Sequence, residues 1–166
     1  MKESILILFI LLLITLTSCN TTVKERGVAG GLLKKYDFHQ LDSLLSLEER
    51  PIAVFLHADW CKFCKNMKQT TFQNKEVIAL LNNNYYFFSF DGENKNDVFF
   101  HNNLFRYQPL GRDNGKHELA SSLGTINGEL AFPTFVILNS EYEIIFQYNS
   151  FLTGTDMAGI LEKGML

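Results

Sequence analysis

The chain has 166 residues, of which 46% are hydrophobic, 13% aromatic and 20% charged, which is sufficient for one globular domain with a substantial core. The net charge is −3 at pH 7, and the sequence contains no basic cluster. Nucleic acid is therefore not an expected partner, because binding to its phosphates requires concentrated positive charge.

The first residues have the features of an export signal. Lys2 precedes an apolar stretch, residues 5–16, that is too short to span a bilayer but suits the apolar region of a signal peptide. It ends in Leu-Thr-Ser-Cys, which resembles the lipobox of bacterial lipoproteins. We therefore expect a lipoprotein signal peptide over residues 1–18 and a lipid on Cys19 that anchors the protein to a membrane. The alternative is an ordinary signal peptide followed by an incidental cysteine.

Of the three cysteines, Cys19 stands alone and Cys61 and Cys64 lie close together in the sequence. If Cys19 carries a lipid, Cys61 and Cys64 remain as a pair in an exported protein. The envelope outside the inner membrane is oxidising, so such a pair can stay oxidised or cycle. We expect the protein to lie in the bacterial cell envelope and to face the periplasm.

Residues 19–36 predict a flexible tether, because they contain three glycines and no strong apolar period before Leu32. The folded domain is expected over residues 37–166. Its first predicted elements are a helix over 37–49, a buried strand over 52–58, and a helix from 61 to about 82 that breaks near Gln73. The residues of this last segment expected to face the core are Phe63, Met67, Val77, Ile78, Leu80 and Leu81.

A second buried strand is predicted over residues 85–90. Helices near 97–105 and 117–123, separated by a loop, follow in a polar region. After Pro133 the sequence predicts two strands joined by a turn at residues 140–142, and then a short helix capped by Thr155 or Asp156.

This order of elements predicts an α/β fold with a mixed four-stranded sheet flanked by helices, in which the first strands are parallel and the last two antiparallel. Residues 96–128 form an insertion before the last two strands. Its aromatic side chains predict either a lid beside the site or a small satellite core. These side chains are Phe99, Phe100, Phe105 and Tyr107.

The motif Trp-Cys-Lys-Phe-Cys, residues 60–64, places two thiols at the start of a helix directly after a buried strand. A disulfide across so short a loop stabilises a fold by only about 2 kcal/mol, so this pair suits opening and closing better than cross-linking. The free N–H groups and the dipole of the helix N-terminus favour a thiolate on Cys61. The pattern predicts that Cys61 attacks a substrate disulfide and that Cys64 resolves the mixed disulfide.

Residues 58–65, Ala-Asp-Trp-Cys-Lys-Phe-Cys-Lys, and the later Phe-Pro-Thr of residues 132–134 resemble the thioredoxin superfamily. Within it, the chain is most similar to thioredoxin-like lipoproteins and to the C-terminal domain of the membrane thiol–disulfide interchange reductase. The resemblance covers about residues 52–161. It implies a thioredoxin fold and a thiol–disulfide oxidoreductase that needs no cofactor. Its implied partners are disulfide-containing or dithiol proteins of the envelope and a membrane thiol that donates electrons.

The same resemblance implies roles for four more residues. Pro133 would be cis and would position the substrate, and Phe132 and Thr134 would bind a substrate strand. Trp60 would shield the disulfide. Without the resemblance, Pro133 would be a trans proline that begins an edge strand.

Two positions depart from the family pattern. Phe55 stands where many thioredoxins carry a buried acid, and Lys68 stands where the related reductase domain carries one. The usual carboxylate proton relay is therefore absent or supplied from elsewhere. His57 is one candidate, and a purely structural histidine is the other interpretation. The Lys62-Phe63 dipeptide inside the motif gives no redox direction, although the resemblance favours a reductant.

Other functions are open to paired thiols. Thiolates near His57 and Met67 can hold Cu(I), so a copper carrier is the main alternative. A closed zinc site needs a second ligand pair that the sequence lacks, and Lys65 stands where a haem attachment motif requires His. A binding module without turnover has no need for both the thiol pair and Pro133. We expect a monomer without a bound metal.

Overall fold

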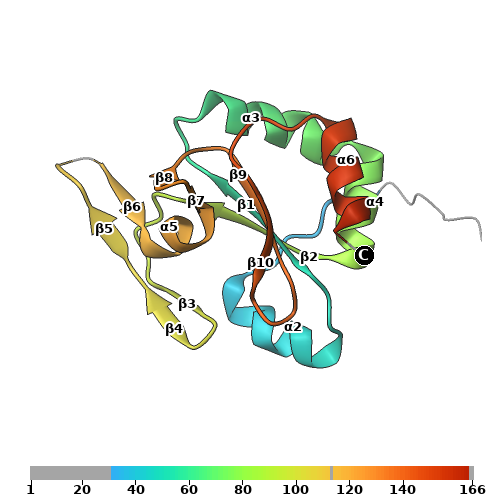
Figure 1. The fold of residues 1–166 in the computed structure, drawn as a ribbon, viewed down its shortest axis with the longest axis horizontal. Coiled ribbons are helices and arrows are strands. Elements are labelled where there is room, and N and C mark those ends of the chain that lie inside the picture. Colours follow the sequence, from blue (N-terminus) through green and yellow to red (C-terminus); the bar gives the residue numbers. More distant parts are fainter. Residues whose placement is uncertain (1–30, 113, 165–166) are drawn as a thin grey trace, which may run out of the picture.

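The computed structural model describes residues 31–112 and 114–164 (Figure 1). The predicted signal peptide, Cys19 and the first part of the predicted tether lie outside the described residues. The last part of that tether already contacts the domain, since the Tyr36 N–H donates to the Phe87 carbonyl (2.9 Å) and the Lys34 N–H donates to the Asn82 side chain (2.8 Å). The folded region therefore begins before the predicted boundary at residue 37.

A mixed four-stranded sheet with the order β10-β9-β1-β2 forms the centre of the domain. The central strand β1 pairs in parallel with β2 and antiparallel with β9, and β9 pairs antiparallel with β10. All six residues of β1 are buried, as its continuous apolar run predicts. The predicted fold class is confirmed. The strands are β1 (Ile52–His57), β2 (Tyr86–Asp91), β9 (Thr134–Leu138) and β10 (Ile144–Tyr148).

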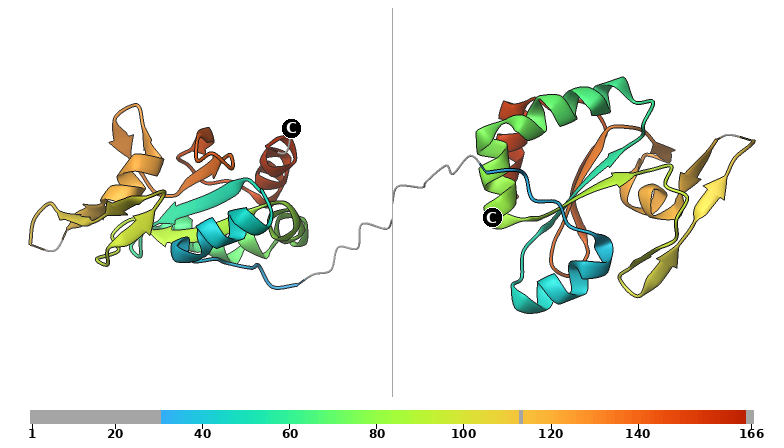
Figure 2. Two further views of the ribbon diagram at one scale, coloured as in Figure 1. Left: turned by 90° about the horizontal axis from the view of Figure 1, so that it is seen from below. Right: turned by 180° about the vertical axis from the view of Figure 1, so that it is seen from behind.

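Helices cover both faces of this sheet (Figures 1 and 2). Alternate residues of β1 enter two separate cores, with Phe55 in the first and Val54 in the second. Among the described residues, the side chains of both cores come from residues 33–161, so this part of the chain has the hydrophobic cores of a domain. The first core lies under α3 (Lys62–Gln69), α4 (Lys75–Asn84) and α6 (Gly154–Lys163), and the second under α2 (Leu41–Leu47) and α5 (Glu118–Gly124).

Two short 3₁₀ segments join the helices. η2 (Phe38–Gln40) leads into α2, and η3 (Thr71–Gln73) separates α3 from α4 at the break that the sequence predicts. Asn74 then begins α4, because its side-chain oxygen accepts hydrogen bonds from the N–H groups of Glu76 (2.9 Å) and Val77 (3.2 Å).

The predicted cap of the last helix is wrong. Thr153, rather than Thr155 or Asp156, caps α6 through a hydroxyl that accepts from the Asp156 N–H (3.2 Å). The Asp156 carboxylate accepts in return from the Thr153 N–H (3.0 Å). This reciprocal pair is a capping box, and its spacing places the helix start one turn before the acidic residue.

The insertion contains two hairpins where a helix and a loop were predicted. Residues 97–105 form β3 (Val98–Phe100) and β4 (Asn103–Phe105), joined by His101 (φ 46°) and Asn102 (φ 59°). Two consecutive residues in the left-handed region make the turn that fits the twist of a two-stranded hairpin. The aromatic and β-branched residues beside that turn favour strands over a helix.

The predicted loop after this hairpin forms a second one, β5 (Tyr107–Pro109) with β6 (Gly115–His117). Both hairpins extend from the sheet on the side away from α6 (Figure 1). The predicted helix near 117–123 is confirmed as α5, and the short strands β7 (Thr125–Ile126) and β8 (Glu129–Leu130) follow it.

The aromatic side chains of the insertion mostly pack. Phe100 is buried in the second core, where its ring meets those of Phe38 (5.3 Å between centroids) and Tyr142 (5.4 Å). Phe105 packs against the same core, whereas Phe99 is 54% exposed. The insertion therefore adds to the second core instead of forming a separate satellite core.

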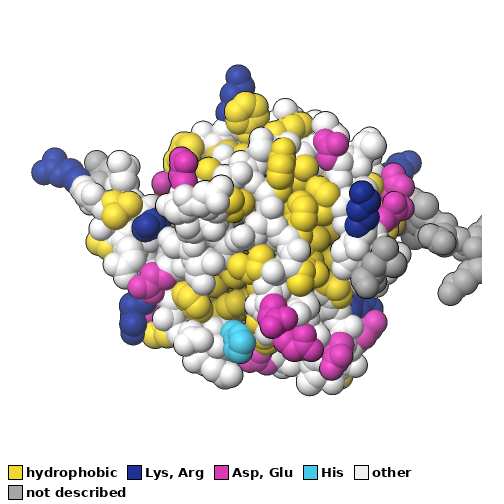
Figure 3. Space-filling model, viewed as in Figure 1, with side chains coloured by type: hydrophobic (Ala, Val, Ile, Leu, Met, Phe, Trp, Pro, Cys, Tyr) yellow, Lys and Arg dark blue, Asp and Glu magenta, His cyan; other side chains and the backbone are white. Residues whose placement is uncertain are grey.

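Strand β10 forms one outer edge of the sheet. It exposes Ile144, Ile145 and Tyr148, and hydrophobic side chains gather in the middle of the face that Figure 3 shows. A register shift between Ile144 and Phe146 interrupts its ladder, which is one way in which natural edges resist further pairing. Across residues 31–164, no helix combines the length and the apolar character that crossing a membrane requires.

Candidate active site

Cys61 occupies the N-cap of α3, immediately after the loop that leaves β1. Its sulfur is bonded to that of Cys64, with 5.2 Å between the Cα atoms, and it also accepts a hydrogen bond from the Cys64 N–H (3.0 Å). A sulfur in this position faces the unpaired N–H groups and the positive end of the helix dipole. The helix start thus offers the stabilisation of a Cys61 thiolate that the sequence predicts.

The two cysteines have different surroundings along the helix. Cys61 stands at the helix entrance and Cys64 lies inside the first turn, and both contribute to the first core with Met67. Both side chains are buried in the disulfide form, at 3% and 1% exposure. This order fits a leading Cys61 and a resolving Cys64, and that division of roles stays a prediction.

The Phe132–Pro133 peptide bond is cis, as the resemblance implies. Thr134, which begins β9, is buried, and its hydroxyl donates to the Ala131 carbonyl (2.6 Å). Within the described residues, the Phe132 N–H and C=O take part in no backbone hydrogen bond. These two groups are therefore available to pair with an added strand, although substrate binding by Phe132 and Thr134 remains a prediction.

The Phe132 ring is held in place by two neighbours. It meets the Trp60 ring edge to face, with 6.1 Å between centroids, and it packs directly on the backbone of Gly92. A Cβ atom at position 92 would lie 2.1 Å from the tip of this ring, so the contact requires glycine. The Gly92 N–H donates to the His57 carbonyl (2.7 Å), and the Gly92 carbonyl accepts from the His117 N–H (2.7 Å). Gly92 thereby connects the end of β1, the insertion and the cis-proline loop.

Trp60 lies at the surface beside this loop. It is 65% exposed, and its indole N–H donates to the Glu93 carboxylate (2.9 Å). This hydrogen bond and the Phe132 contact fix the ring next to the cysteine that follows it in sequence. The predicted shielding role fits this placement and stays a prediction.

Phe63, which was predicted to face the core, is instead 61% exposed. It follows the helix start on the outer side of α3, and its ring lies 6.4 Å from that of Phe151. The apolar spacing of the helix is satisfied by Cys64 and Met67, which leaves Phe63 on the surface. Trp60, Phe63, Phe132 and Phe151 thus place aromatic rings around the disulfide, and we refer to these four residues as the aromatic rim.

The buried acid of the family pattern is absent here. Phe55 fills that position at 1% exposure and packs on the rings of Phe72 (4.7 Å) and His57 (5.5 Å). Lys68 places its ammonium nitrogen 3.2 Å from both ring nitrogens of His57. A histidine and a lysine are therefore in contact beside Phe55, where the resemblance implies a carboxylate.

Burial, together with the charge of Lys68, lowers the pKa of His57 to about 4. Burial also lowers the pKa of Lys68. At neutral pH the histidine is consequently uncharged and accepts a hydrogen bond from the ammonium group. These contacts favour the structural interpretation of His57, and proton transfer by this residue stays a hypothesis.

We expect His57 to make the protein less stable as the pH falls from about 6.5 to about 4. An unfolded histidine binds its proton near pH 6.5, whereas folded His57 resists protonation until about pH 4. The stabilisation is therefore complete above pH 6.5, is lost progressively down to pH 4, and does not change further below. Its size is about 2 kcal/mol after allowance for partial solvent screening. Urea unfolding of the oxidised protein at pH 7, 5.5 and 4 measures it.

The matched variants are His57→Gln and His39→Gln, since His39 is exposed on η2. The first should lose this part of the pH dependence, and the second should keep it. Equal pH profiles for wild type and His57→Gln would show that folding does not lower the pKa of this histidine.

The copper alternative requires further metal-binding side chains beside the two thiols. Met67 is fully buried in the first core, and His57 is occupied by Lys68. His117, a further histidine, caps α5 by accepting from the Leu119 N–H (3.1 Å) and contacts the Asn96 carbonyl (3.1 Å). In the part of the chain that the structure describes, no three His, Cys, Asp or Glu side chains come together as a metal site. The donor arrangement thus gives the copper hypothesis no support.

The sequence of residues 39–165 matches the pattern of the thioredoxin-like domain family. This protein belongs to the thioredoxin-like family. Among curated proteins, no sequence relative was found. The family assignment explains why a buried strand, a CxxC helix start and a cis-proline loop occur together in this chain.

Solved structures of the same fold cover most of this thioredoxin-like protein. A DsbH oxidoreductase is 17% identical with a TM-score of 0.58, and the match covers 84% of this chain and 89% of that one. A disulphide isomerase from Xylella fastidiosa Temecula1 is 15% identical with a TM-score of 0.53, covering 77% and 88%. The reduced C-terminal domain of DsbD from Neisseria meningitidis is 18% identical with a TM-score of 0.51, covering 75% and 90%. At these identities the similarity establishes the fold.

Within this fold, the Cys61–Cys64 disulfide beside the cis-proline loop is a thiol–disulfide oxidoreductase centre. Sequence reasoning found the two cysteines and Pro133, but it missed Gly92, Glu93 and Phe151. A glycine directly after a buried strand is a signal of close backbone approach, and Gly92 carries it. Nothing in the local sequence indicates that Phe151 reaches α3.

Proposed function

We propose that this thioredoxin-like protein reduces disulfides in proteins of the bacterial cell envelope. In this proposal residues 1–18 direct export, a lipid on Cys19 holds the protein to a membrane, and residues 19–30 link that lipid to a monomeric domain in the periplasm. The observation that carries the proposed chemistry is the position of the Cys61 sulfur, at the start of α3 and bonded to Cys64. Phe132, which precedes the cis-proline, packs against the core that contains both cysteines.

The reaction begins with the reduced pair. The Cys61 thiolate attacks one sulfur of the substrate disulfide, which forms a mixed disulfide and releases the other substrate sulfur as a thiolate. Cys64 then loses its proton and attacks the Cys61 sulfur. The Cys61–Cys64 disulfide forms, and the second substrate sulfur leaves as a thiolate. Two electrons pass from the pair to the substrate, and a membrane dithiol donor returns the pair to its reduced form.

Substrate binding would use the surface around the disulfide. The free backbone groups of Phe132 can pair with an extended substrate segment, as in the addition of a strand to a sheet. Trp60 and the Phe132 ring offer apolar contact to the residues that flank a substrate cysteine. Because Glu93 holds Trp60, the aromatic wall exists before substrate binds.

The reduction potential of the pair tests the direction of this reaction. We expect a value of about −270 mV, as for reducing thioredoxins. We also expect the pre-reduced protein to catalyse the reduction of insulin. Equilibration with glutathione buffers, followed by thiol alkylation and mass measurement, gives the potential. A value of about −120 mV would identify an oxidase and overturn the proposal. If the cysteine pair exchanges with none of the glutathione buffers, the proposed thiol–disulfide oxidoreductase activity is itself overturned.

A further inference from the structure

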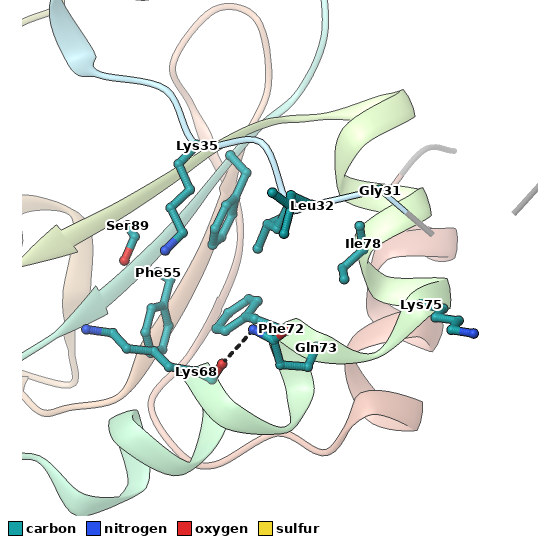
Figure 4. Close-up of a pocket in the computed structure, with 12 residues that line it drawn as sticks. Gly31, Leu32, Lys35, Phe55, Lys68, Phe72, Gln73, Lys75, Ile78 and Ser89 are labelled. Atoms are coloured by element: carbon teal, nitrogen blue, oxygen red, sulfur yellow. Dashed lines mark hydrogen bonds between the residues drawn. The ribbon is translucent and has the colours of Figure 1, made fainter. Parts of the chain in front are cut away.

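A second site lies on the face of the sheet that α3 and α4 cover (Figure 4). It is a cavity of about 490 Å³, within the range of small-molecule sites, and Cys61, Cys64 and Pro133 do not line it. Its apolar wall consists of Phe55 from β1, Phe72 from η3, Ile78 from α4 and Phe87 from β2. The site is therefore separate from the disulfide, although Phe55 belongs to the same core as both cysteines.

Residues 31–35 form the outer wall of this cavity. The segment is fixed to α4 at Asn82, whose amide donates to the Leu32 carbonyl (3.0 Å) and whose side-chain oxygen accepts from the Lys34 N–H (2.8 Å). Just beyond it, the Tyr36 N–H donates to the edge of β2 at Phe87 (2.9 Å). Hydrogen bonds at both ends hold this wall, so the cavity is a built part of the fold.

Among the described residues, the ammonium groups of Lys35 and Lys68 at this apolar cavity form no ion pair. Lys35 and Lys68 extend toward the region of Ser89 and Phe55, whereas Lys75 points away (Figure 4). The ion pairs among the described residues involve Arg50 and Arg106, so neither of the two inward lysines has a carboxylate within bonding distance.

Among the described residues, the direct polar neighbour of the Lys68 ammonium group is a histidine ring and not a carboxylate. This ring belongs to His57, while Asp59 and Asp91 act on the ammonium group only from a distance and Lys35 and Lys65 repel it. Positive charge at the edge of a low-dielectric cavity is stabilised by a hydrogen-bonded anion. A negative group with an apolar body behind it would fit these ammonium groups and the apolar wall beside them.

We propose that this cavity binds a small amphipathic monoanion, with its carboxylate or sulfonate between Lys35 and Lys68 and its apolar body against Phe55, Phe72 and Phe87. Chain-like and aromatic anions share this chemistry. The site is independent of thiol–disulfide exchange, so it can be tested on the oxidised protein.

The test uses residues 20–166, which retain both cores and the whole cavity wall. Calorimetric titration compares octanoate and 2-naphthoate with their uncharged counterparts octanamide and 2-naphthamide. At least one acid should bind, and its amide should bind at least about tenfold more weakly, because a charge-assisted hydrogen bond is lost. Tighter binding of octanoate identifies a chain-like ligand, and tighter binding of 2-naphthoate identifies an aromatic one.

Lys35→Met and Lys68→Met keep an unbranched side chain, one atom shorter, and remove its charge. Lys75→Met is the matched control, because Lys75 points away from the cavity. The first two should weaken binding at least about tenfold, and the control should remain within about twofold of wild type. Lys68→Arg restores the charge and should restore binding. Equal affinities for acid and amide, no binding of either acid at 1 mM, or equal weakening by Lys75→Met would overturn the proposal.

A measurement on the wild-type protein locates the ligand without any variant. Backbone amide NMR shifts caused by the bound acid should be largest at Phe72, Phe87 and Ser89. Shifts concentrated at Trp60 and Phe132 would place the ligand on the aromatic rim and would also overturn the proposal.

Discussion

The Cys64→Ser variant is expected to accumulate mixed disulfides with substrate proteins through Cys61, and its steady-state reduction of insulin should fall to the uncatalysed rate. Cys61 lies at the helix entrance and can still attack, but the group that releases the product lies at Cys64 inside the first turn. The intermediate therefore forms and cannot resolve. Non-reducing gel electrophoresis of the pre-reduced variant with a disulfide substrate, followed by peptide mapping of the adduct, measures the trapped species.

The controls for this experiment are the reciprocal variant Cys61→Ser and the double variant Cys61→Ser/Cys64→Ser. Neither should trap a substrate, since both lack the leading thiol. Adducts that form through Cys64 in the Cys61→Ser protein, and not through Cys61 in the Cys64→Ser protein, would reverse the two roles.

Phe55→Ala is expected to lower the free energy of unfolding by about 3–5 kcal/mol. The Phe55 ring is 1% exposed between Phe72 and His57, so truncation leaves a cavity in the first core directly below the CxxC helix. A loss of this size is a large part of the about 5–15 kcal/mol that stabilises an ordinary domain. Urea unfolding of the oxidised protein at pH 7 gives the value.

Phe99→Ala is the matched control, because Phe99 is 54% exposed on the β3–β4 hairpin. Its substitution should change the unfolding free energy by no more than about 0.5 kcal/mol. A cost below about 1 kcal/mol for Phe55→Ala would mean that the surrounding rings close over the gap.

The central strands and the active-site motif could be predicted because their signals are local. The run from Ile52 to His57 is apolar at nearly every position, which is typical of a strand buried on both faces. The Cys61–Cys64 spacing after that strand places both sulfurs at a helix start whatever the rest of the fold does. The family resemblance then added the cis bond at Pro133, which local pattern alone does not indicate.

The errors occur where the local signal is weak or where partners come from distant parts of the chain. In residues 97–105 the aromatic and β-branched residues favour strands only weakly, and the turn at His101 and Asn102 makes the segment a hairpin. Phe63 was assigned to the core from helical spacing, but Cys64 and Met67 occupy the buried face of α3. The sequence does not show that the exposed Phe63 ring instead meets Phe151, from the loop before α6.

The hydrogen bonds and ring contact of Gly92 make the insertion an integral part of the catalytic architecture. Hairpin β5–β6 holds this glycine through the His117 N–H, and the glycine in turn supports the Phe132 ring next to the cis-proline. Exchange of the two hairpins for a short connector would thus disturb the cis-proline loop even though neither cysteine is removed. Length variation among homologues in this region should accordingly be accompanied by changes at positions 92 and 132, so the three features are expected to be inherited as one unit.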